Sequence, residues 1–332
     1  MLTRRQRRTL RGLTLVELMV GLTLGMMLSA ALLTLLSTAS SIGSNLKRSS
    51  LLIENARYTA ELLRDDLQLA GFWGELETSA AAYTTPDPCS TGTDGWVAAP
   101  LGLPSPVRGY GADEVLACPQ SRRAGTSALA VRRLEVASTP AATPLAGGTQ
   151  DFLQPSFCTT DPSSQPFQIG HDPAAFTLRA RNCTAASPLR GYVRRLYFIA
   201  SCNRCGNGGD STPTLKRLDV VNGGLTETSL VEGVEELRFE YGFDTDNDGS
   251  VDSWLMAAGN SGAAARWENV VALKVHFVVR SPDRAIGDTL GEAQTFVLGG
   301  TGTLTAPVDG YVRRAYSTTV RLINPSAARE VQ

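Results

Sequence analysis

An uninterrupted apolar run near the N-terminus constrains this chain more than any other feature. Residues 18–36 contain no charged side chain, and residues 1–11 are rich in arginine and contain no acid. The arginines are Arg4, Arg5, Arg7, Arg8 and Arg11. At ~1.5 Å per residue, a helix over the apolar run spans about 28 Å, roughly the hydrocarbon core of a bilayer. Because arginines favour the cytoplasmic side, the chain is expected to cross a membrane once and to place everything after residue 36 on the far side.

One carboxylate, that of Glu17, stands at the edge of this apolar run. An ionisable group in or next to hydrocarbon costs roughly 3 kcal/mol or more, so such residues are rare and usually have a dedicated partner. An ordinary secretory signal has no use for this carboxylate. Glu17 is therefore a candidate functional residue.

Three interpretations of the N-terminus are open. A cleaved secretory signal would use the small residues at 28–30 as its cleavage site, and a plain signal anchor would remain uncut. The third is a type III signal, which a prepilin peptidase cuts on the cytoplasmic side of the apolar run. The residues favour the third, because they resemble the type IV pilin family: Gly12 precedes the cut, Leu13 becomes the new N-terminus, and Glu17 is the fifth mature residue.

The helix is predicted to continue well beyond the apolar run. Apolar residues recur at i, i+4 and i+7 and form one stripe, with charged residues on the opposite face. The stripe consists of Leu52, Ala56, Thr59, Ala60, Leu63, Leu67 and Ala70. The expected organisation is a cleaved leader over 1–12, a long helix over 13–72 (membrane or filament-core part 13–36, amphipathic part 44–70) and a globular domain over 73–332.

The globular domain is predicted to be rich in β-strands. Apolar and polar residues alternate over 237–241 and 271–279, which is typical of half-buried strands. Further strands are expected over 129–136, 192–199 and 316–322. A hydrophobic content of 42% and a net charge of −1 exclude general disorder and give no electrostatic reason to expect a nucleic-acid partner. The predicted fold class is α+β: a long N-terminal helix packed on an antiparallel sheet, with loop-rich insertions over 80–190.

Two stretches, residues 58–74 and 313–320, look like the minor pilin PilW family. The resemblance implies a type IV pilin-like fold and a mature chain that is N-methylated at Leu13. It also implies a single-pass inner-membrane protein with a periplasmic domain, which joins other minor pilins and the major pilin in the complex that initiates the pilus (fimbrium) and stays near its tip. In such a filament the Glu17 carboxylate can pair with the Leu13 ammonium of a neighbouring subunit, which would fix the axial register.

Two other functions share the same N-terminus. One is a minor pseudopilin of the J type in a type II secretion system. The other is a tip-exposed adhesin, whose loop-rich residues 80–190 would contact a host or surface ligand. The loop residues that would select a binding partner follow no recognisable sequence pattern, so the sequence leaves these alternatives open.

Residues 244–252 form the strongest side-chain constellation in the globular domain. Alternate carboxylates around a tight glycine turn direct several oxygens at one point, as Ca²⁺ requires. The candidate ligands are Asp244, Asp246, Asp248, Ser250 (through its carbonyl) and Asp252. The pattern departs from an EF-hand loop at its last position, where Leu255 replaces the bidentate glutamate. We expect a structural calcium site, and the alternative is a solvated acidic turn between two strands.

Six cysteines on the non-cytoplasmic side predict disulfides. Proximity in sequence suggests Cys89 with Cys118 and Cys158 with Cys183. Cys202 and Cys205 form a Cys-x-x-Cys pair, which is expected to form a disulfide, either locally or with another cysteine. A zinc site would need two more ligands, and a thioredoxin-type centre would need a helix where residues 206–210 are rich in glycine.

No enzyme activity is predicted. His171 lies beside an Asp-Pro pair, and His276 lies on the polar face of a predicted strand with Lys274. Neither histidine belongs to a recognisable nucleophile or metal motif.

Overall fold

The computed structural model describes residues 14–140, 148–162, 165–221, 223–256, 267–284 and 293–330. The predicted leader lies outside the described residues, and so do Gly12 and Leu13 on either side of the predicted cut. The chain divides into two units, Met1–Ser50 and Leu51–Gln332. Helix α1 (Leu15–Gln68) begins in the first unit and ends in the second.

The first unit consists, where described, of the N-terminal part of α1. Its large apolar side chains are exposed, and the helix is long and apolar enough to cross a membrane. The apolar run over 18–36 is helical throughout, as predicted. A helix that is apolar on all sides is stable only where lipid or other helices surround it.

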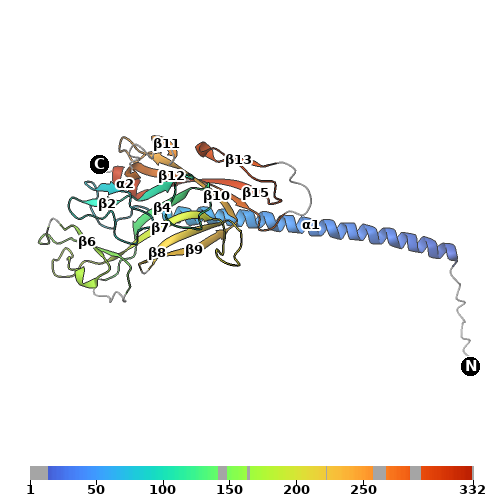
Figure 1. The fold of residues 1–332 in the computed structure, drawn as a ribbon, viewed down its shortest axis with the longest axis horizontal. Helices are drawn as coiled ribbons and strands as arrows, with labels where there is room; N and C mark the ends of the chain where they lie inside the picture. The colour runs from blue at the N-terminus through green and yellow to red at the C-terminus, as the bar shows by residue number, and fades with distance from the viewer. Residues whose placement is uncertain are drawn as a thin grey trace, which may run out of the picture. The chain divides into compact units, whose positions relative to one another are not determined.

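The second unit contains a seven-stranded antiparallel sheet, and several of its strands are labelled in Figure 1. Its strand order is β3-β4-β7-β5-β6, with β8 and then β9 added beside β7. The strands are β3 (Val107–Tyr110), β4 (Ala128–Leu134), β5 (Phe152–Pro155), β6 (Phe167–Gly170), β7 (Arg190–Ala200), β8 (Thr214–Val221) and β9 (Gly224–Glu232). One edge of the long strand β7 thus pairs first with β5 and then with β8.

A second antiparallel sheet has four strands in the order β11-β10-β12-β15. They are β10 (Val234–Phe243), β11 (Ser253–Met256), β12 (Val270–Arg280) and β15 (Arg313–Arg321). Two short pairs complete the strands, β1 (Ala82–Thr84) with β2 (Gly102–Pro104) and β13 (Thr295–Val297) with β14 (Thr303–Thr305). Among the described residues, the remaining elements are the 3-10 helices η1 (Pro173–Ala175), η3 (Trp267–Asn269) and η4 (Gly299–Thr301) and the helix α2 (Ile323–Glu330).

The apolar stripe of α1 supplies the centre of the main core. Six of the seven stripe residues are buried and Ala60 is partly buried, so the predicted amphipathic face is confirmed. They pack with inward-facing residues of both large sheets, such as Tyr197 of β7, Phe239 of β10 and Val275 of β12. The fold class is therefore confirmed as α+β, with a long helix packed on antiparallel sheets.

Two glycines allow close contacts at this core. Gly71 has φ +71°, donates its N–H to the carbonyl of Arg132, and lies in the turn that follows the end of α1 at Gln68. Gly109 of β3 lies so close to Tyr241 of β10 that a Cβ would be 1.6 Å from the phenol oxygen. Any side chain at Gly109 would displace this ring from the core.

The loop-rich segment has its own aromatic cluster. Trp96 contacts Trp73, Phe167 and Tyr192 edge to face, with ring centroids 5.2, 5.3 and 5.3 Å away.

All five predicted strands are present within a few residues of the expected bounds, and the 80–190 segment adds short strands that the sequence did not predict. Those strands are too short to show a two-residue periodicity.

Candidate functional site

The first candidate site is the start of helix α1, where Glu17 interacts with Thr14. The Glu17 Oε2 atom accepts hydrogen bonds from the Thr14 N–H at 3.0 Å and from the Thr14 hydroxyl at 2.9 Å. In return the Thr14 Oγ1 atom accepts from the Glu17 N–H at 3.3 Å. This reciprocal arrangement is a capping box, which satisfies helix N–H groups that have no partner in the helix.

The sequence pattern also contained a signal for this capping box that was not used, because Thr-x-x-Glu before an apolar run is its signature. Only one of the two carboxylate oxygens takes part in these bonds. The other oxygen therefore remains available to a cation. Gly12 and Leu13 lie outside the described residues, so the predicted cleavage site stays a prediction.

The second candidate site is the acidic loop that joins β10 to β11. Asp244, Asp246 and Asp252 each offer a carboxylate oxygen, and these oxygens lie within 4.8 Å of one another. Asn247 and Gly249 adopt positive φ values of 66° and 81°, which turn the chain tightly enough to gather the carboxylates. Three of the five candidate ligands therefore lie close together, and the calcium site itself stays a prediction.

The carboxylates of the loop differ in their surroundings. Asp244 is fully buried and accepts from the N–H groups of Asn247 and Gly249 at 2.7 and 2.9 Å. Asp252 accepts from the Thr245 N–H and hydroxyl, both at 2.7 Å, and these bonds lower its pKa. By contrast, loss of hydration and the charges of Asp248 and Asp252 raise the pKa of Asp246.

The other two predicted ligands, Asp248 and Ser250, do not belong to this group of three carboxylates. The Oδ1 atom of Asp248 accepts a hydrogen bond from the Ser250 N–H at 2.7 Å.

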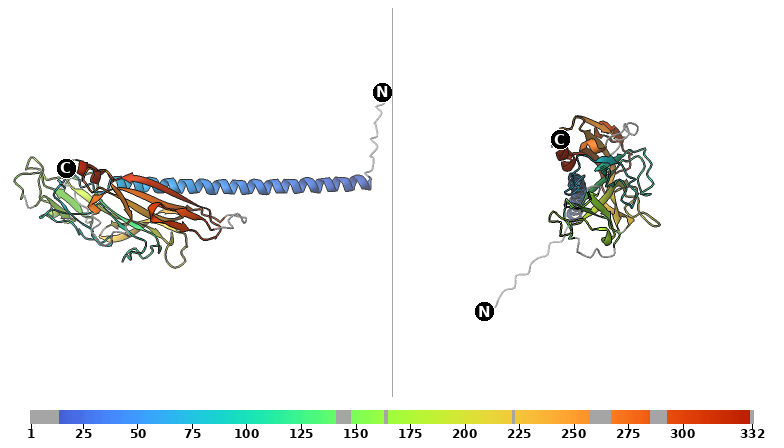
Figure 2. Two further views of the ribbon diagram at one scale, coloured as in Figure 1. Left: turned by 90° about the horizontal axis from the view of Figure 1, so that it is seen from above. Right: turned by 90° about the vertical axis from the view of Figure 1, so that its left-hand side faces the viewer.

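Arg329 of α2 also reaches the loop, with Nη1 3.4 Å from Asp244 Oδ2 and 2.5 Å from Asn247 Oδ1. Figure 2 shows this C-terminal helix next to the end of α1. The guanidinium offsets part of the negative charge, a contribution that the sequence pattern could not show.

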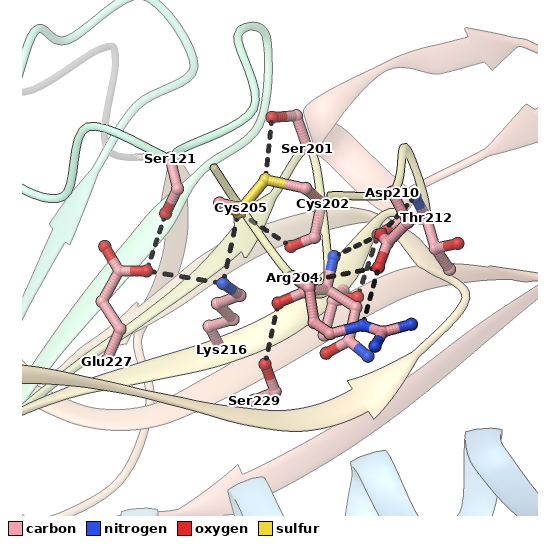
Figure 3. The surroundings of a disulfide bond; sticks show 12 residues. Ser121, Ser201, Cys202, Arg204, Cys205, Asp210, Thr212, Lys216, Glu227 and Ser229 are labelled. Atoms are coloured by element: carbon pink, nitrogen blue, oxygen red, sulfur yellow. Dashed lines mark hydrogen bonds and ion pairs between the residues drawn. A yellow bond between two sulfur atoms is a disulfide. The ribbon is translucent and has the colours of Figure 1, made fainter. Parts of the chain in front are cut away.

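All six cysteines are paired within the chain. The disulfides join Cys89 to Cys118, Cys158 to Cys183 and Cys202 to Cys205. The first two are the pairs that proximity suggested, and the third is the local alternative for the Cys-x-x-Cys pair. Figure 3 shows this third bridge in the turn between β7 and β8.

A buried ionic cluster around Asp66 was missed by the sequence analysis. Its Oδ1 atom accepts from Arg133 at 2.9 Å and from Arg195 at 2.7 Å, and its Oδ2 atom accepts from the Tyr197 hydroxyl at 2.9 Å. Burial and the adjacent carboxylate raise the pKa of Tyr197. Asp66 thus anchors α1 to strands β4 and β7, where the apolar pattern alone predicts no contact.

The two histidines have acidic partners but no nucleophile beside them among the hydrogen bonds of the described residues. His171 lies 3.3 Å from Asp151, and His276 lies 2.9 Å from Glu240. Glu240 also accepts from the Gly300 N–H at 2.8 Å, so the second pair holds η4 against the sheet. The contact with Glu240 thus gives His276 a structural role.

Comparison with known proteins adds two findings. The family described as Type IV Pilus-assembly protein W matches residues 196–324, which run from β7 into α2. A type IV-like pilin from Thermus thermophilus is similar in structure, with 14% identity and a TM-score of 0.34 over 82% of this chain and 97% of that chain. No curated protein matches the chain.

The family match includes one of the two stretches in which the sequence resembled this family, residues 313–320. The other stretch, residues 58–74, precedes it. The match also contains the acidic loop and the Cys202–Cys205 bridge. Over residues 196–324 the chain thus carries the sequence pattern of the type IV pilus-assembly protein W family, which confirms the family that the sequence resembled.

Proposed function

We propose that this chain is a minor pilin that takes part in initiating and assembling a type IV pilus, in a complex of minor pilins near the pilus tip. The match of residues 196–324 to a family of pilus-assembly proteins carries the proposal. The exposed apolar helix supports it, because such a surface needs lipid before assembly and other apolar helices afterwards. The role is structural, as expected of an assembly protein.

Removal of the gene in the organism that encodes it tests this function. We expect a large loss of surface pili while type II secretion continues, with recovery when the full chain is supplied again. Lost secretion with normal pili would favour the J-type pseudopilin instead. Normal pili and secretion with lost surface attachment would favour the tip adhesin.

Processing between Gly12 and Leu13 belongs to the same proposal. A prepilin peptidase would cut on the cytoplasmic side of the apolar run, and Leu13 would be methylated. Mass spectrometry of the membrane-extracted protein should find methylated Leu13 as the first residue. A mature chain starting near Ala31 would show an ordinary secretory signal.

We also propose that the acidic loop binds Ca²⁺ and that the ion stabilises the fold. The donors fit a hard cation, because they are carboxylate oxygens gathered around a tight turn. Asp246 and Asp252 are exposed and would supply the accessible oxygens, whereas Asp244 already has backbone and arginine partners. Loss of hydration, followed by repulsion from Asp248 and Asp252, raises the pKa of Asp246, and a bound dication would relieve the repulsion.

Thermal unfolding tests the calcium proposal. A ligand that binds only the folded state adds roughly 2.7 kcal/mol at a hundredfold excess over its Kd, so calcium should raise the melting temperature of a soluble fragment starting at Ser44. Chelator should reverse the shift. The double variant Asp246→Ala, Asp248→Ala should lose the response, whereas Asp65→Ala, on the exposed face of α1, should keep it. Identical melting with calcium and with chelator would leave the loop as an acidic turn.

A further inference from the structure

The Cys202–Cys205 disulfide differs from the other two in what it does for the fold. It spans a sequence separation of 3, whereas the other bridges span 29 and 25. The stabilisation that a disulfide gives by restricting the unfolded chain grows with the logarithm of the loop it closes. This bridge therefore contributes least to stability, and its opening leaves the two long-range bridges in place.

A buried lysine lies directly against this disulfide (Figure 3). Lys216 of β8 points its Nζ atom at Cys205 Sγ, at a distance of 3.4 Å, and only 6% of its side chain is exposed. Its acidic neighbour is Glu227 of β9, 3.5 Å away, which also accepts from the Ser121 hydroxyl at 2.9 Å. The buried Lys216 ammonium thus shares the Glu227 carboxylate with the Ser121 hydroxyl.

Within the described residues, the other two disulfides have no such cation. Among the hydrogen bonds of the described residues, no lysine or arginine donates to their sulfur atoms. Arg179 comes near the second bridge but donates to the backbone carbonyl of Cys183. The ammonium contact is therefore specific to the Cys202–Cys205 bridge within the described part of the chain.

We propose that Cys202–Cys205 is an exchangeable, redox-reactive disulfide whose reductant is a dithiol. When the bridge opens, Cys205 Sγ becomes a thiolate against the Lys216 ammonium, which then has an anionic partner in addition to Glu227. A leaving thiolate that is stabilised in this way departs faster, which accelerates exchange. This site is independent of the pilus function proposed above.

The exchange is balanced in two steps. A thiolate of the dithiol attacks Cys202 Sγ, the bond between the two cysteine sulfurs breaks, and the electron pair leaves with Cys205 Sγ. In the mixed disulfide, Cys202 Sγ is bonded to the first sulfur of the reductant. The second thiol of the reductant then attacks that first sulfur, and Cys202 leaves and takes up the proton that the second thiol releases. The protein gains two electrons, and the dithiol becomes a disulfide.

The surroundings permit both the attack and the return. Cys205 is exposed and Cys202 is partly exposed, so a small dithiol can reach the bridge. Asp210 accepts from the N–H groups of Asn203, Arg204 and Thr212 at 2.8, 3.0 and 3.0 Å. Because these bonds hold the turn without the disulfide, the two cysteines stay close after reduction and can be reoxidised.

Differential alkylation of the oxidised full chain in detergent tests the proposal, with dithiothreitol as the probe. After graded exposure and quenching, peptide mass spectrometry reports which cysteines have opened. We expect Cys202 and Cys205 to open together, at least about tenfold faster than the other four. Opening of all three bridges at one rate, or of another bridge first, would overturn the proposal.

Variants separate the role of Lys216 from simple exposure. Lys216→Gln, which keeps a donor but removes the charge, should open about tenfold more slowly, and Lys216→Arg should restore the rate. Glu227→Gln should have the opposite effect, because it removes the competing carboxylate, and it serves if the first variant does not fold. Lys274→Gln, at a lysine of β12 that lies over the Trp254 ring, is the matched control and should open at the wild-type rate. Equal rates in Lys216→Gln and the unaltered chain would refute the role of the ammonium.

Discussion

At the scale of single residues, two interactions of Glu17 are of interest: one observed within the chain and one proposed between chains. Within its own chain it closes a capping box with Thr14. In the proposed filament its other oxygen would meet a neighbour's N-terminal ammonium. The first interaction needs only a hydrogen-bond acceptor, whereas the second needs a negative charge. Glutamine can close a capping box but cannot neutralise an ammonium. The two tasks of Glu17 can therefore be separated by substitution.

We expect both Glu17→Gln and Glu17→Ala to insert into the membrane and fold but to lose incorporation into the pilus-initiating complex. Only Glu17→Ala should also fray the first turn of α1, at a cost of about 1 kcal/mol. Counting pili in a strain with no redundant homologue, with the unaltered chain as control, measures the first effect. Normal piliation with Glu17→Gln would assign Glu17 to capping alone.

Asp66 is the second residue whose charge decides a contact. Asp66→Ala would leave the guanidinium groups of Arg133 and Arg195 without their shared carboxylate in a largely buried site. The expected loss is about 2–4 kcal/mol of unfolding free energy in urea titration. Asp65→Ala, at the exposed neighbouring position, should change stability by less than about 0.5 kcal/mol. Similar losses in the two variants would contradict the buried cluster.

At the scale of elements, the C-terminal helix α2 joins parts of the chain that are remote in sequence. Asn324 donates from Nδ2 to the carbonyls of Gln68 and Ala70 at 3.4 and 3.2 Å, and so caps the end of α1. Arg329 reaches the acidic loop, and the Ser326 hydroxyl donates to the carbonyl of Gly249 at 2.7 Å. One short helix thus fixes both the end of α1 and the loop between β10 and β11.

Asn324→Ala should therefore destabilise the fold by about 0.5–1.5 kcal/mol, because two helix carbonyls lose their donor. Ile323→Ala is the control, since Ile323 is the exposed first residue of the same helix. Urea titration of the soluble fragment measures both variants. Equal stability of Asn324→Ala and the unaltered fragment would show that water replaces the cap at no cost.

A second element-scale prediction concerns strand β15, which Asp309 ties down through Arg313. Asp309 binds the Arg313 guanidinium through both oxygens at 2.7 Å, and this interaction lowers the pKa of Asp309 to about 2 from an ordinary 3.8. A lowered carboxyl pKa stabilises the fold above the unfolded value, and that stabilisation is lost as the pH falls from about 4 to about 2.

Asp309→Asn should cost about 1 kcal/mol at pH 7, after allowance for solvent screening, and little at pH 2. Urea titrations at both pH values test the difference, with Asp65→Asn as the control that should show no comparable pH dependence. A constant difference between Asp309→Asn and the unaltered fragment at the two pH values would contradict the ion pair.

At the scale of the whole molecule, local periodicity explains what the sequence could predict. The stripe from Leu52 to Ala70 and the alternation in β10 and β12 are repeated over many residues, so each element was recognisable without its neighbours. The acidic loop was recognisable for the same reason, since its ligand candidates lie within one turn.

Long-range partners were beyond such reasoning. The contact of Arg329 with the acidic loop and the change of partner along one edge of β7 depend on which segments meet in space. The buried contacts of Asp66 could not be predicted for a different reason. A charged residue interrupts an apolar pattern in the same way whether its side chain faces water or a buried arginine. Pattern reading therefore located the elements and the loop but not the electrostatic contacts that join them.

The position of α2 also has a consequence for the order of events during synthesis. Helix α1 leaves the ribosome well before the residues that cap its end, because Asn324 follows its partners Gln68 and Ala70 by 256 and 254 residues. The domain is therefore expected to stay incompletely folded until α2 has also been made. A copy that lacks residues 323–330 would keep the apolar helix but lose the contacts that fix the end of α1 and the acidic loop.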